Sequence, residues 1–251
     1  MAETKTKTKT KKAIDYKINV EEMTAAGVLF GHKNSKTNPK MKPYIEKVRD
    51  TIAIIDLEET TEKLKEALSF IEDFVSQGKT VLFVGTKIPS RDLIEKIANE
   101  CSAPFVNEKW IGGTFTNFTE ISTRIKHMKD LEAEVVTREF EKHTKKEKIK
   151  IHHELTKLKK KFGGIEELKK LPDAIFVSDM QENILSIKEA RKKEVKVIAI
   201  ADTNADPTLC DYFIPANDDA LSSLSYILER VKKAIIEGRS RIQKPTEESK
   251  E

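Results

Sequence analysis

The sequence predicts an α/β protein built on a doubly wound parallel sheet of about five strands, with helices on both faces of the sheet. Short apolar runs alternate along the chain with helical patterns, which is the signature of this architecture. The apolar runs are nearly continuous, as expected for strands that are buried on both faces. One long and highly charged helical interval interrupts the alternation. We therefore expect a three-layer body with a helical insertion, for which 251 residues are sufficient.

Three apolar runs are the clearest strands, at residues 80–85, 174–178 and 195–201. Weaker candidates lie at residues 51–55, 104–106 and 212–214. We expect five parallel strands with one reversal of strand order.

Helices are expected in the intervals between the strands. Residues 57–77 show a helical pattern that ends at Gly78, and residues 90–101 begin with Ser90 as a candidate cap. Residues 219–237 carry apolar side chains at helical spacing, and we expect Gly238 to end that helix.

Residues 117–171 form the insertion. Apolar side chains at helical spacing occur at residues 121–128 and again at 151–162, and Thr144 and Glu147 have the spacing of a capping box that starts the second helix. Gly163 and Gly164 follow that helix and should stop it. We expect an antiparallel, coiled-coil-like hairpin with a narrow apolar seam and a charged outside. A short third helix at residues 165–170 would return the chain to the sheet.

The two ends of the chain differ in composition from the rest. Residues 1–12 alternate threonine and lysine, and residues 243–251 are polar, so neither segment can offset its ordering entropy by burial. We expect both to be disordered. The sheet domain then comprises residues 13–116 and 172–242, with the insertion between them.

Charge is unevenly distributed along the chain. Charged residues make up 35% of it, against roughly 25% in ordinary soluble domains. Residues 1–12 carry +4 and residues 119–171 carry +5, which leaves the remainder at −5. Residues 31–49 hold six Lys or Arg against one acid, among glycine, asparagine and proline. Such a turn-rich segment cannot bury itself; it is either a solvated loop or a surface for a polyanion such as nucleic acid.

Other composition features exclude several classes of protein. Cys101 and Cys210 are too few for a disulfide framework or a CxxC metal site, so we expect reduced thiols in a cytosol. No apolar run approaches the roughly 18 residues of a membrane span, and no signal peptide follows the lysine-rich start. We expect a soluble protein that is not exported.

Aspartates follow several of the predicted strands, where ligands bind in doubly wound sheets. Asp179, Asp202 and Asp218 could bind Mg²⁺ there, as in a phosphate- or Mg-dependent enzyme. However, the chain has neither GxGxxG nor GxxxxGK[ST], and acids at strand-to-helix junctions are expected as caps and turn residues. We favour the structural role and keep the enzyme as the alternative. Trp110, beside two glycines, is expected to anchor packing, with base stacking as its alternative.

Several motifs resemble the family of bacterial small-subunit ribosomal protein S-two. They include AGVLFGH at residues 26–32, NPKM at 38–41, LFVGTK at 82–87, WIGGT at 110–114 and IPANDDA at 214–220. The motifs run in order over roughly residues 20–240. This resemblance implies a flavodoxin-like sheet domain with a helical hairpin, in a non-catalytic protein that binds small-subunit rRNA.

The resemblance also implies partners and a location. The protein would support subunit assembly, contact neighbouring small-subunit proteins and help to dock ribosomal protein S-one, as part of cytoplasmic ribosomes. It would use no membrane, no small-molecule substrate and no cofactor, with a structural Mg²⁺ shared with rRNA as an open alternative. A further hypothesis, compatible with this role but not implied by the resemblance, is that the hairpin docks onto protein or RNA.

Seven cations are the expected phosphate contacts, and they would position the protein without reading sequence. They are Lys33, Lys36, Lys40, Lys42, Arg49, Lys87 and Lys109. Asn38 and Asn117 are expected to add hydrogen bonds to ribose or base.

Overall fold

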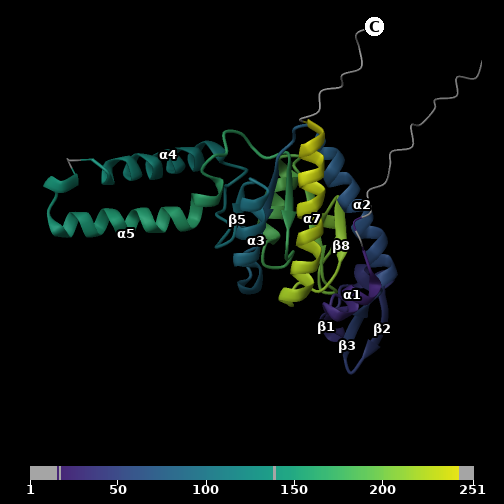
Figure 1. Cartoon of the computed structure of the whole chain (residues 1–251). Coiled ribbons are helices and arrows are strands. Elements are labelled where there is room, and N and C mark those ends of the chain that lie inside the picture. Colours follow the sequence, from purple (N-terminus) through teal and green to yellow (C-terminus); the bar gives the residue numbers. More distant parts are fainter. Residues whose placement is uncertain (1–15, 17, 138–139, 243–251) are drawn as a thin grey trace, which may run out of the picture.

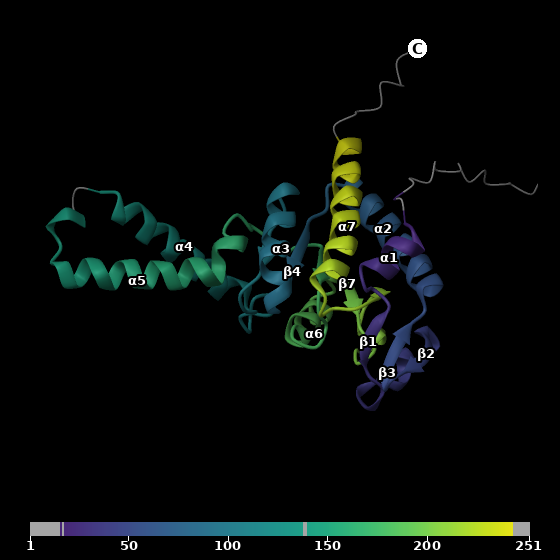
Figure 2. The same cartoon turned by 60° about the horizontal axis from the view of Figure 1, so that its bottom comes forward.

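The structure, a computed structural model, describes residues 16, 18–137 and 140–242. Its body has three layers, with a sheet between two layers of helices, and a long helical hairpin projects from one side (Figure 1). A second, smaller sheet lies on the side away from the hairpin, as a second view shows (Figure 2). The expected terminal tails, residues 1–12 and 243–251, lie outside the described residues.

The main sheet contains the five expected parallel strands. They are β4 (Val81–Val84), β5 (Phe105–Val106), β6 (Ala174–Val177), β7 (Lys196–Ala201) and β8 (Tyr212–Pro215). Their order is β5-β4-β6-β7-β8, and every neighbouring pair is parallel. The chain moves outward from β4 to β5 and then returns past β4 to β6, which is the expected reversal. This order confirms the doubly wound, flavodoxin-like fold.

Two apolar clusters fill the two sides of this sheet. On one side, strand residues such as Phe83 and Phe176 pack with α1 (Val20–Ala25), α2 (Leu57–Ser76), α3 (Ile88–Glu100) and α7 (Leu221–Ile242). On the other side, their neighbours Leu82 and Val177 pack with α6 (Ile184–Lys192) and the root of the hairpin. Successive strand residues point to opposite faces, and both faces are covered. This double burial explains the continuous apolar runs in the sequence.

Helix α2 confirms the expected helix at residues 57–77, and its Asp56 cap accepts a hydrogen bond from the Glu58 N–H (2.8 Å). The expected Ser90 cap is wrong. Helix α3 begins at Ile88, and Ser90 is buried in its first turn, where its hydroxyl donates to the Lys87 carbonyl (2.8 Å). Pro89 explains the earlier start, because its fixed φ suits the first turn of a helix.

Gly238 does not end α7, contrary to the expectation from sequence. The helix continues to Ile242. A Cβ at residue 238 would lie 2.7 Å from the Glu72 carbonyl oxygen and 3.0 Å from the Val75 Cβ. Glycine is therefore present because α2 and α7 approach each other closely at this point, and it marks a packing contact and not a helix end.

The weak strand candidate at residues 51–55 belongs to a second sheet that the sequence pattern did not reveal. Strand β3 (Ile52–Ile55) lies between β1 (Phe30–Lys33) and β2 (Ile45–Arg49) and pairs antiparallel with both. Two 3-10 helices, η1 (Asn34–Lys36) and η2 (Pro39–Tyr44), join β1 to β2. The basic segment 31–49 is thus ordered by pairing with β3, and the expectation that it cannot bury itself is wrong at Met41, which is fully buried.

The insertion is the expected antiparallel hairpin of α4 (Phe118–Val135) and α5 (Lys145–Phe162), with η3 (Phe140–Lys142) in the connection (Figure 1). The Thr144 capping box is present, and α5 ends before η4 (Gly163–Ile165). The expected third helix at residues 165–170 is wrong, since only η4 forms there. Gly164 packs against the Phe105 carbonyl, and the chain must leave helical geometry before Pro172. No helix in the described residues is both long and apolar enough to cross a membrane.

Replacing Gly238 with alanine should destabilise the protein, although alanine is the better helix former by about 1 kcal/mol. The added methyl group would meet a backbone carbonyl of α2, and overpacking of this kind costs about 1–3 kcal/mol. We expect a lower melting temperature for Gly238→Ala. Ser240→Ala, at an exposed position of the same helix, should leave it nearly unchanged. A Gly238→Ala protein as stable as the Ser240→Ala protein would contradict the packing role.

Candidate nucleic-acid interface

The small sheet carries a group of exposed cations that we call the basic tip: Lys33, Lys36, Lys42 and Arg49. The three lysines have no ion-pair partner among the residues that the structure describes. The Arg49 guanidinium lies 3.7 Å from the Asp50 carboxylate, but these side chains are 79% and 91% exposed. Such exposed pairs contribute little free energy. The basic tip therefore presents four positive charges to solvent.

Asn38 and Lys40 fasten the basic tip to the main body. The Asn38 N–H donates to the Thr203 carbonyl (2.8 Å), and the Asn38 Oδ1 accepts from the Lys40 N–H (3.0 Å). The Lys40 ammonium donates to the Asp206 carboxylate (2.7 Å) and the Thr208 hydroxyl (2.9 Å), around η5 (Pro207–Leu209). The hydrogen bond from Lys40 lowers the pKa of Asp206. The charge of Lys40 is thus partly neutralised within the protein.

β1 approaches the loop after β7 very closely. A Cβ at Gly31 would lie 2.4 Å from the Thr203 Cγ2, and the His32 N–H donates to the Thr203 hydroxyl (2.9 Å). The His32 Nδ1 lies 3.1 Å from Asp202, and its Nε2 lies 3.6 Å from Asp219. The hydrogen bond to Asp202 raises the pKa of His32, although burial opposes this shift. His32 therefore links the small sheet to the loops at the end of the main sheet.

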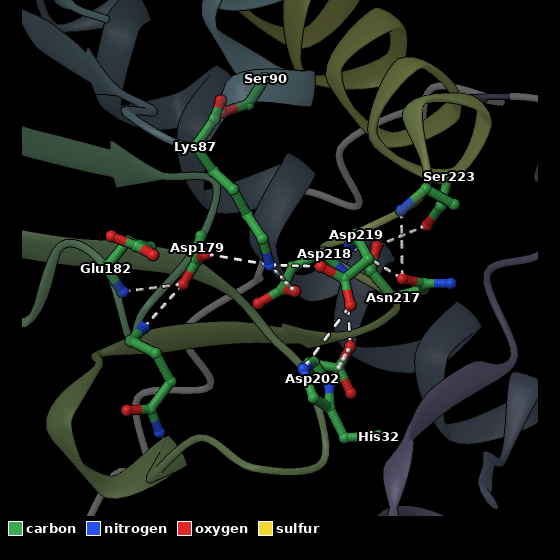
Figure 3. Close-up of polar contacts among 12 residues, drawn as sticks. His32, Lys87, Ser90, Asp179, Glu182, Asp202, Asn217, Asp218, Asp219 and Ser223 are labelled. Atoms are coloured by element: carbon green, nitrogen blue, oxygen red, sulfur yellow. Dashed lines mark hydrogen bonds and ion pairs between the residues drawn. The ribbon is translucent and has the colours of Figure 1, made fainter. Parts of the chain in front are cut away.

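Lys87 lies at the centre of a cluster at the carboxyl ends of the main strands (Figure 3). It follows β4, Asp179 follows β6, and Asp218 and Asp219 follow β8. The ammonium lies 3.2, 2.8 and 2.6 Å from the carboxylates of Asp179, Asp218 and Asp219. Burial alone would lower the pKa of Lys87, but its hydrogen bonds to Asp218 and Asp219 raise it. This geometry does not favour the predicted phosphate contact of Lys87, because three carboxylates already surround its charge.

Asp218 has the most perturbed carboxyl group of this cluster. Burial and the neighbouring charges of Asp179 and Asp202 raise the pKa of Asp218 to about 7. His32, Asp202 and Asp218 also offer one nitrogen and two oxygen atoms within 4.8 Å of one another, donor types that divalent cations accept. Asp179, Asp202 and Asp218 therefore lie close together at the ends of the strands, as the sequence predicted.

The same acids also organise the local backbone. Asp179 accepts hydrogen bonds from the N–H groups of Gln181 (2.8 Å) and Glu182 (3.1 Å). Asn217 accepts from the N–H groups of Asp219 (2.8 Å) and Ala220 (3.2 Å) ahead of α7. Figure 3 shows these caps around the ion pairs. Asp179 and Asn217 thus have the turn and cap roles that the sequence analysis favoured for polar residues at the strand-to-helix junctions.

Glu189 of α6 organises the loop that leads into the hairpin. Its buried carboxylate accepts hydrogen bonds from the N–H groups of Gly113 (2.8 Å), Phe115 (3.0 Å) and Thr116 (3.2 Å). Burial alone would raise the pKa of Glu189, but these backbone hydrogen bonds lower it. Sequence reasoning missed this residue. The available signal was an acidic residue next to buried Ile187 and Ala190 on the apolar side of α6.

The Glu189-bound loop carries the two remaining predicted contacts, Lys109 and Asn117, and both are exposed. The Asn117 N–H donates to the Gly113 carbonyl (2.8 Å), while the Asn117 side chain makes no capping bond to α4. Trp110 is only 6% exposed and packs edge-on against Phe115 at 4.9 Å. Trp110 is therefore the packing anchor that was expected, and its indole is not available for base stacking.

The structure divides the predicted contacts into separate groups. The basic tip lies on the side of the body away from the hairpin, whereas Lys109 and Asn117 lie at the hairpin root (Figure 1). Lys40 and Lys87 belong to neither group of free cations, because Lys40 pairs with Asp206 and Lys87 pairs with Asp218.

Comparison with known proteins gives consistent relatives. Residues 23–238 match a family model described as Ribosomal protein S2. Proteins named Small ribosomal subunit protein uS2 from two strains of Thermus thermophilus are each 44% identical over 229 residues, which cover 91% of this chain and 90% of theirs. A protein of the same name from Coprothermobacter proteolyticus is 44% identical over 222 residues, which cover 88% of this chain and 83% of that protein.

Replacing Lys87 with glutamine should strongly destabilise the fold. Asp179 and Asp218 are each 2% exposed, and removing one partner of a buried ion pair costs about 3–5 kcal/mol. We expect a lower melting temperature at pH 7.5. The loss of stability relative to the wild type should be smaller at lower pH, because protonation of Asp218 removes one uncompensated charge. Lys42→Gln is the control and should have no effect; equal stability of the two variants would contradict the role of Lys87.

Replacing Glu189 with glutamine should remove a pH-dependent contribution to stability. The pKa of Glu189 is lowered from 4.5 in the folded protein, so its stabilisation is complete at neutral pH and is lost as the pH falls through the lowered pKa. We expect the Glu189→Gln protein to be less stable by about 2 kcal/mol at pH 7 in urea unfolding, and this deficit should narrow only below about pH 4.5. Glu182→Gln, an exposed change, should show neither effect. A Glu189→Gln deficit that does not change with pH would argue against the carboxylate as its source.

Proposed function

The chain belongs to the ribosomal protein S2 family, and from this membership and the geometry of the basic tip we propose that it binds small-subunit rRNA. Its role is that of a structural, non-enzymatic protein of the ribosome. The alternative enzyme built on Asp179, Asp202 and Asp218 is therefore set aside. In this role, those aspartates maintain the fold and do not act on a substrate.

The basic tip is the observation that supports rRNA binding most directly. Its cations are exposed, and the lysines lack ion-pair partners among the described residues, whereas Lys40 and Lys87 are neutralised by nearby acids. A cation without an internal partner gains most from a phosphate group, because binding releases the counterions that surround the RNA. We assign phosphate contacts to the basic tip for this reason.

The rigidity of the small sheet supports the same proposal. The basic tip is attached through Asn38, Lys40 and His32, and Met41 is buried beneath it. Pre-organised cations lose less conformational entropy when they bind than cations on a mobile tail. Lys40 and Lys87 then have the task of holding the loops that carry the contacts, while Asn38 remains close enough to the surface to reach ribose or base.

The hairpin root would supply further contacts. Lys109 is exposed on the loop held by Glu189, and the Asn117 side chain makes no bond to its own helix end. We propose that Lys109 binds phosphate and that Asn117 donates or accepts a hydrogen bond at ribose or base. These contacts would orient the hairpin relative to the RNA.

We further propose the finer roles implied by the family resemblance. The protein would support assembly of the small subunit, contact neighbouring small-subunit proteins and help to dock ribosomal protein S-one, in cytoplasmic ribosomes. It would need no cofactor, and Mg²⁺ would enter only as an ion shared between protein and RNA phosphates. These roles rest on family membership and not on a particular contact.

Neutralising the basic tip should weaken rRNA binding and its dependence on salt. In a variant with Lys33, Lys36, Lys42 and Arg49 all changed to glutamine, four phosphate contacts are lost. We expect the slope of log affinity against log salt to fall by about three, since each contact contributes about 0.7–0.9. The measurement is a filter-binding titration of the full chain with small-subunit rRNA at several salt concentrations.

A matched control removes four exposed lysines from the helices that cover the main sheet. These are Lys65, Lys96, Lys188 and Lys233. Their change to glutamine lowers the net charge equally but should leave the salt slope within about one of the wild-type value. Equal losses in both variants would show that net charge, and not the basic tip, drives binding.

A further inference from the structure

Thr203 of the main body binds both ends of a short basic segment of the small sheet. The segment comprises residues 33–37 and contains η1. The residue before it, His32, donates its backbone N–H to the Thr203 hydroxyl (2.9 Å). The residue after it, Asn38, donates its backbone N–H to the Thr203 carbonyl (2.8 Å). We call residues 33–37 the Thr203-bound loop, because it leaves the main body and returns to it at this one residue.

The Thr203-bound loop carries Lys33 and Lys36 of the basic tip. Both lysines are exposed, and neither has an ion-pair partner among the residues that the structure describes. The other two cations of the basic tip lie outside the loop, Lys42 on η2 and Arg49 on β2. The contacts of Thr203 therefore act most directly on Lys33 and Lys36.

Thr203 is itself fixed in position. It is fully buried, and its hydroxyl donates a hydrogen bond to the Asp202 carboxylate (3.0 Å) while it accepts the one from His32. A Cβ at Gly31 would lie 2.4 Å from the Thr203 Cγ2, so the backbone of β1 packs directly against this side chain beside the end of β7 (Figure 2). The hydroxyl and the methyl group of Thr203 are thus both in contact with their surroundings.

The remaining attachments of this region differ from that of Thr203. The Asn34 N–H donates to the Thr51 carbonyl (2.7 Å), which holds the loop to the small sheet but not to the main body. The next attachment to the body is the ion pair between Lys40 and Asp206, beyond the end of the loop. Thr203 therefore sets the position of the Thr203-bound loop relative to the main sheet.

We propose that Thr203 is a positioning residue for RNA binding, whose hydroxyl keeps the Thr203-bound loop in the conformation that presents Lys33 and Lys36 to phosphates. The inference rests on the proposed rRNA binding and adds a buried residue that would not itself touch RNA. Without the hydroxyl, the same two lysines could still reach their phosphates. The loosened loop would have to lose conformational freedom on binding, which weakens affinity without removing a contact.

This effect differs measurably from the loss of a cation. The slope of log affinity against log salt counts the phosphates that are neutralised, whereas an ordering cost weakens binding equally at every salt concentration. A positioning residue should therefore change the affinity and leave the slope as it is.

The test changes Thr203 to valine in the full chain, which keeps the shape of the side chain and removes the hydroxyl. Thr203→Ser keeps the hydroxyl and removes the methyl group. Thr60→Val is the matched control, because Thr60 is also fully buried and its hydroxyl donates to the Pro215 carbonyl (2.7 Å), away from the loop. Binding to small-subunit rRNA is measured at several salt concentrations, and thermal melting checks that each variant is folded at the assay temperature.

We expect Thr203→Val to bind rRNA about tenfold more weakly at every salt concentration, with a salt slope within about 0.5 of the wild-type value. Thr203→Ser and Thr60→Val should each bind within about twofold of the wild type. Wild-type affinity in Thr203→Val, or an equal loss in Thr60→Val, would overturn the inference. A slope lowered by about one or more would overturn it too, because phosphate contacts would then be lost.

Two backgrounds with equal charge test whether the effect passes through the loop. One carries Lys33→Gln and Lys36→Gln, and the other carries Lys42→Gln and Arg49→Gln. Because coupled residues are not additive, adding Thr203→Val should change affinity by less than about twofold in the first background and by about tenfold in the second. Equal effects in both backgrounds would assign Thr203 a general structural role and overturn the inference. Failure of the wild-type chain to bind rRNA would instead refute the proposed function.

Discussion

The structure depends on the neutralisation of buried carboxylates at the carboxyl edge of the main sheet. Parallel strands bring their following loops to one edge, and here Asp179, Asp202 and Asp218 arrive there almost fully buried. Burial and the two neighbouring charges raise the pKa of Asp218. Lys87 comes from the same edge, but His32 comes from the small sheet. The contact between His32 and Asp202 therefore also docks the small sheet onto the body.

This arrangement links fold stability to the presentation of the cations. Lys87 is enclosed by internal acids and Lys40 is partly neutralised by Asp206, whereas the neighbouring lysines of the basic tip have no ion-pair partner among the described residues. The Glu189 carboxylate likewise holds the loop at the hairpin root in position, by accepting hydrogen bonds from its backbone N–H groups. In both places an acid of the protein holds a loop in position, and other cations on that loop stay exposed.

Much of the fold could be predicted from the sequence, because strands that are buried on both faces of a sheet appear as continuous apolar runs. The five strands and α2 appear as apolar runs or helical patterns, and the capping box at Thr144 is a local signal. The predictions for Ser90 and Gly238 were wrong because the neighbouring sequence does not show whether such a residue caps a helix or packs inside it. Of the candidate site, exposure of the basic tip could be expected, but the partners of Lys87 and the role of Glu189 could not.

The sequence by itself determined the strand and helix periodicity, the overall charge pattern and the family resemblance, since each of these is carried by neighbouring residues or by ordered motifs. Tertiary structure decided which cations are free. Lys42 and Lys87 are the same residue type in similarly turn-rich surroundings, yet one is exposed and the other is enclosed by three carboxylates from distant loops. The physical reason is that electrostatic compensation depends on distance in space, and the sheet brings together Lys87 and Asp218, which lie 131 positions apart in the chain.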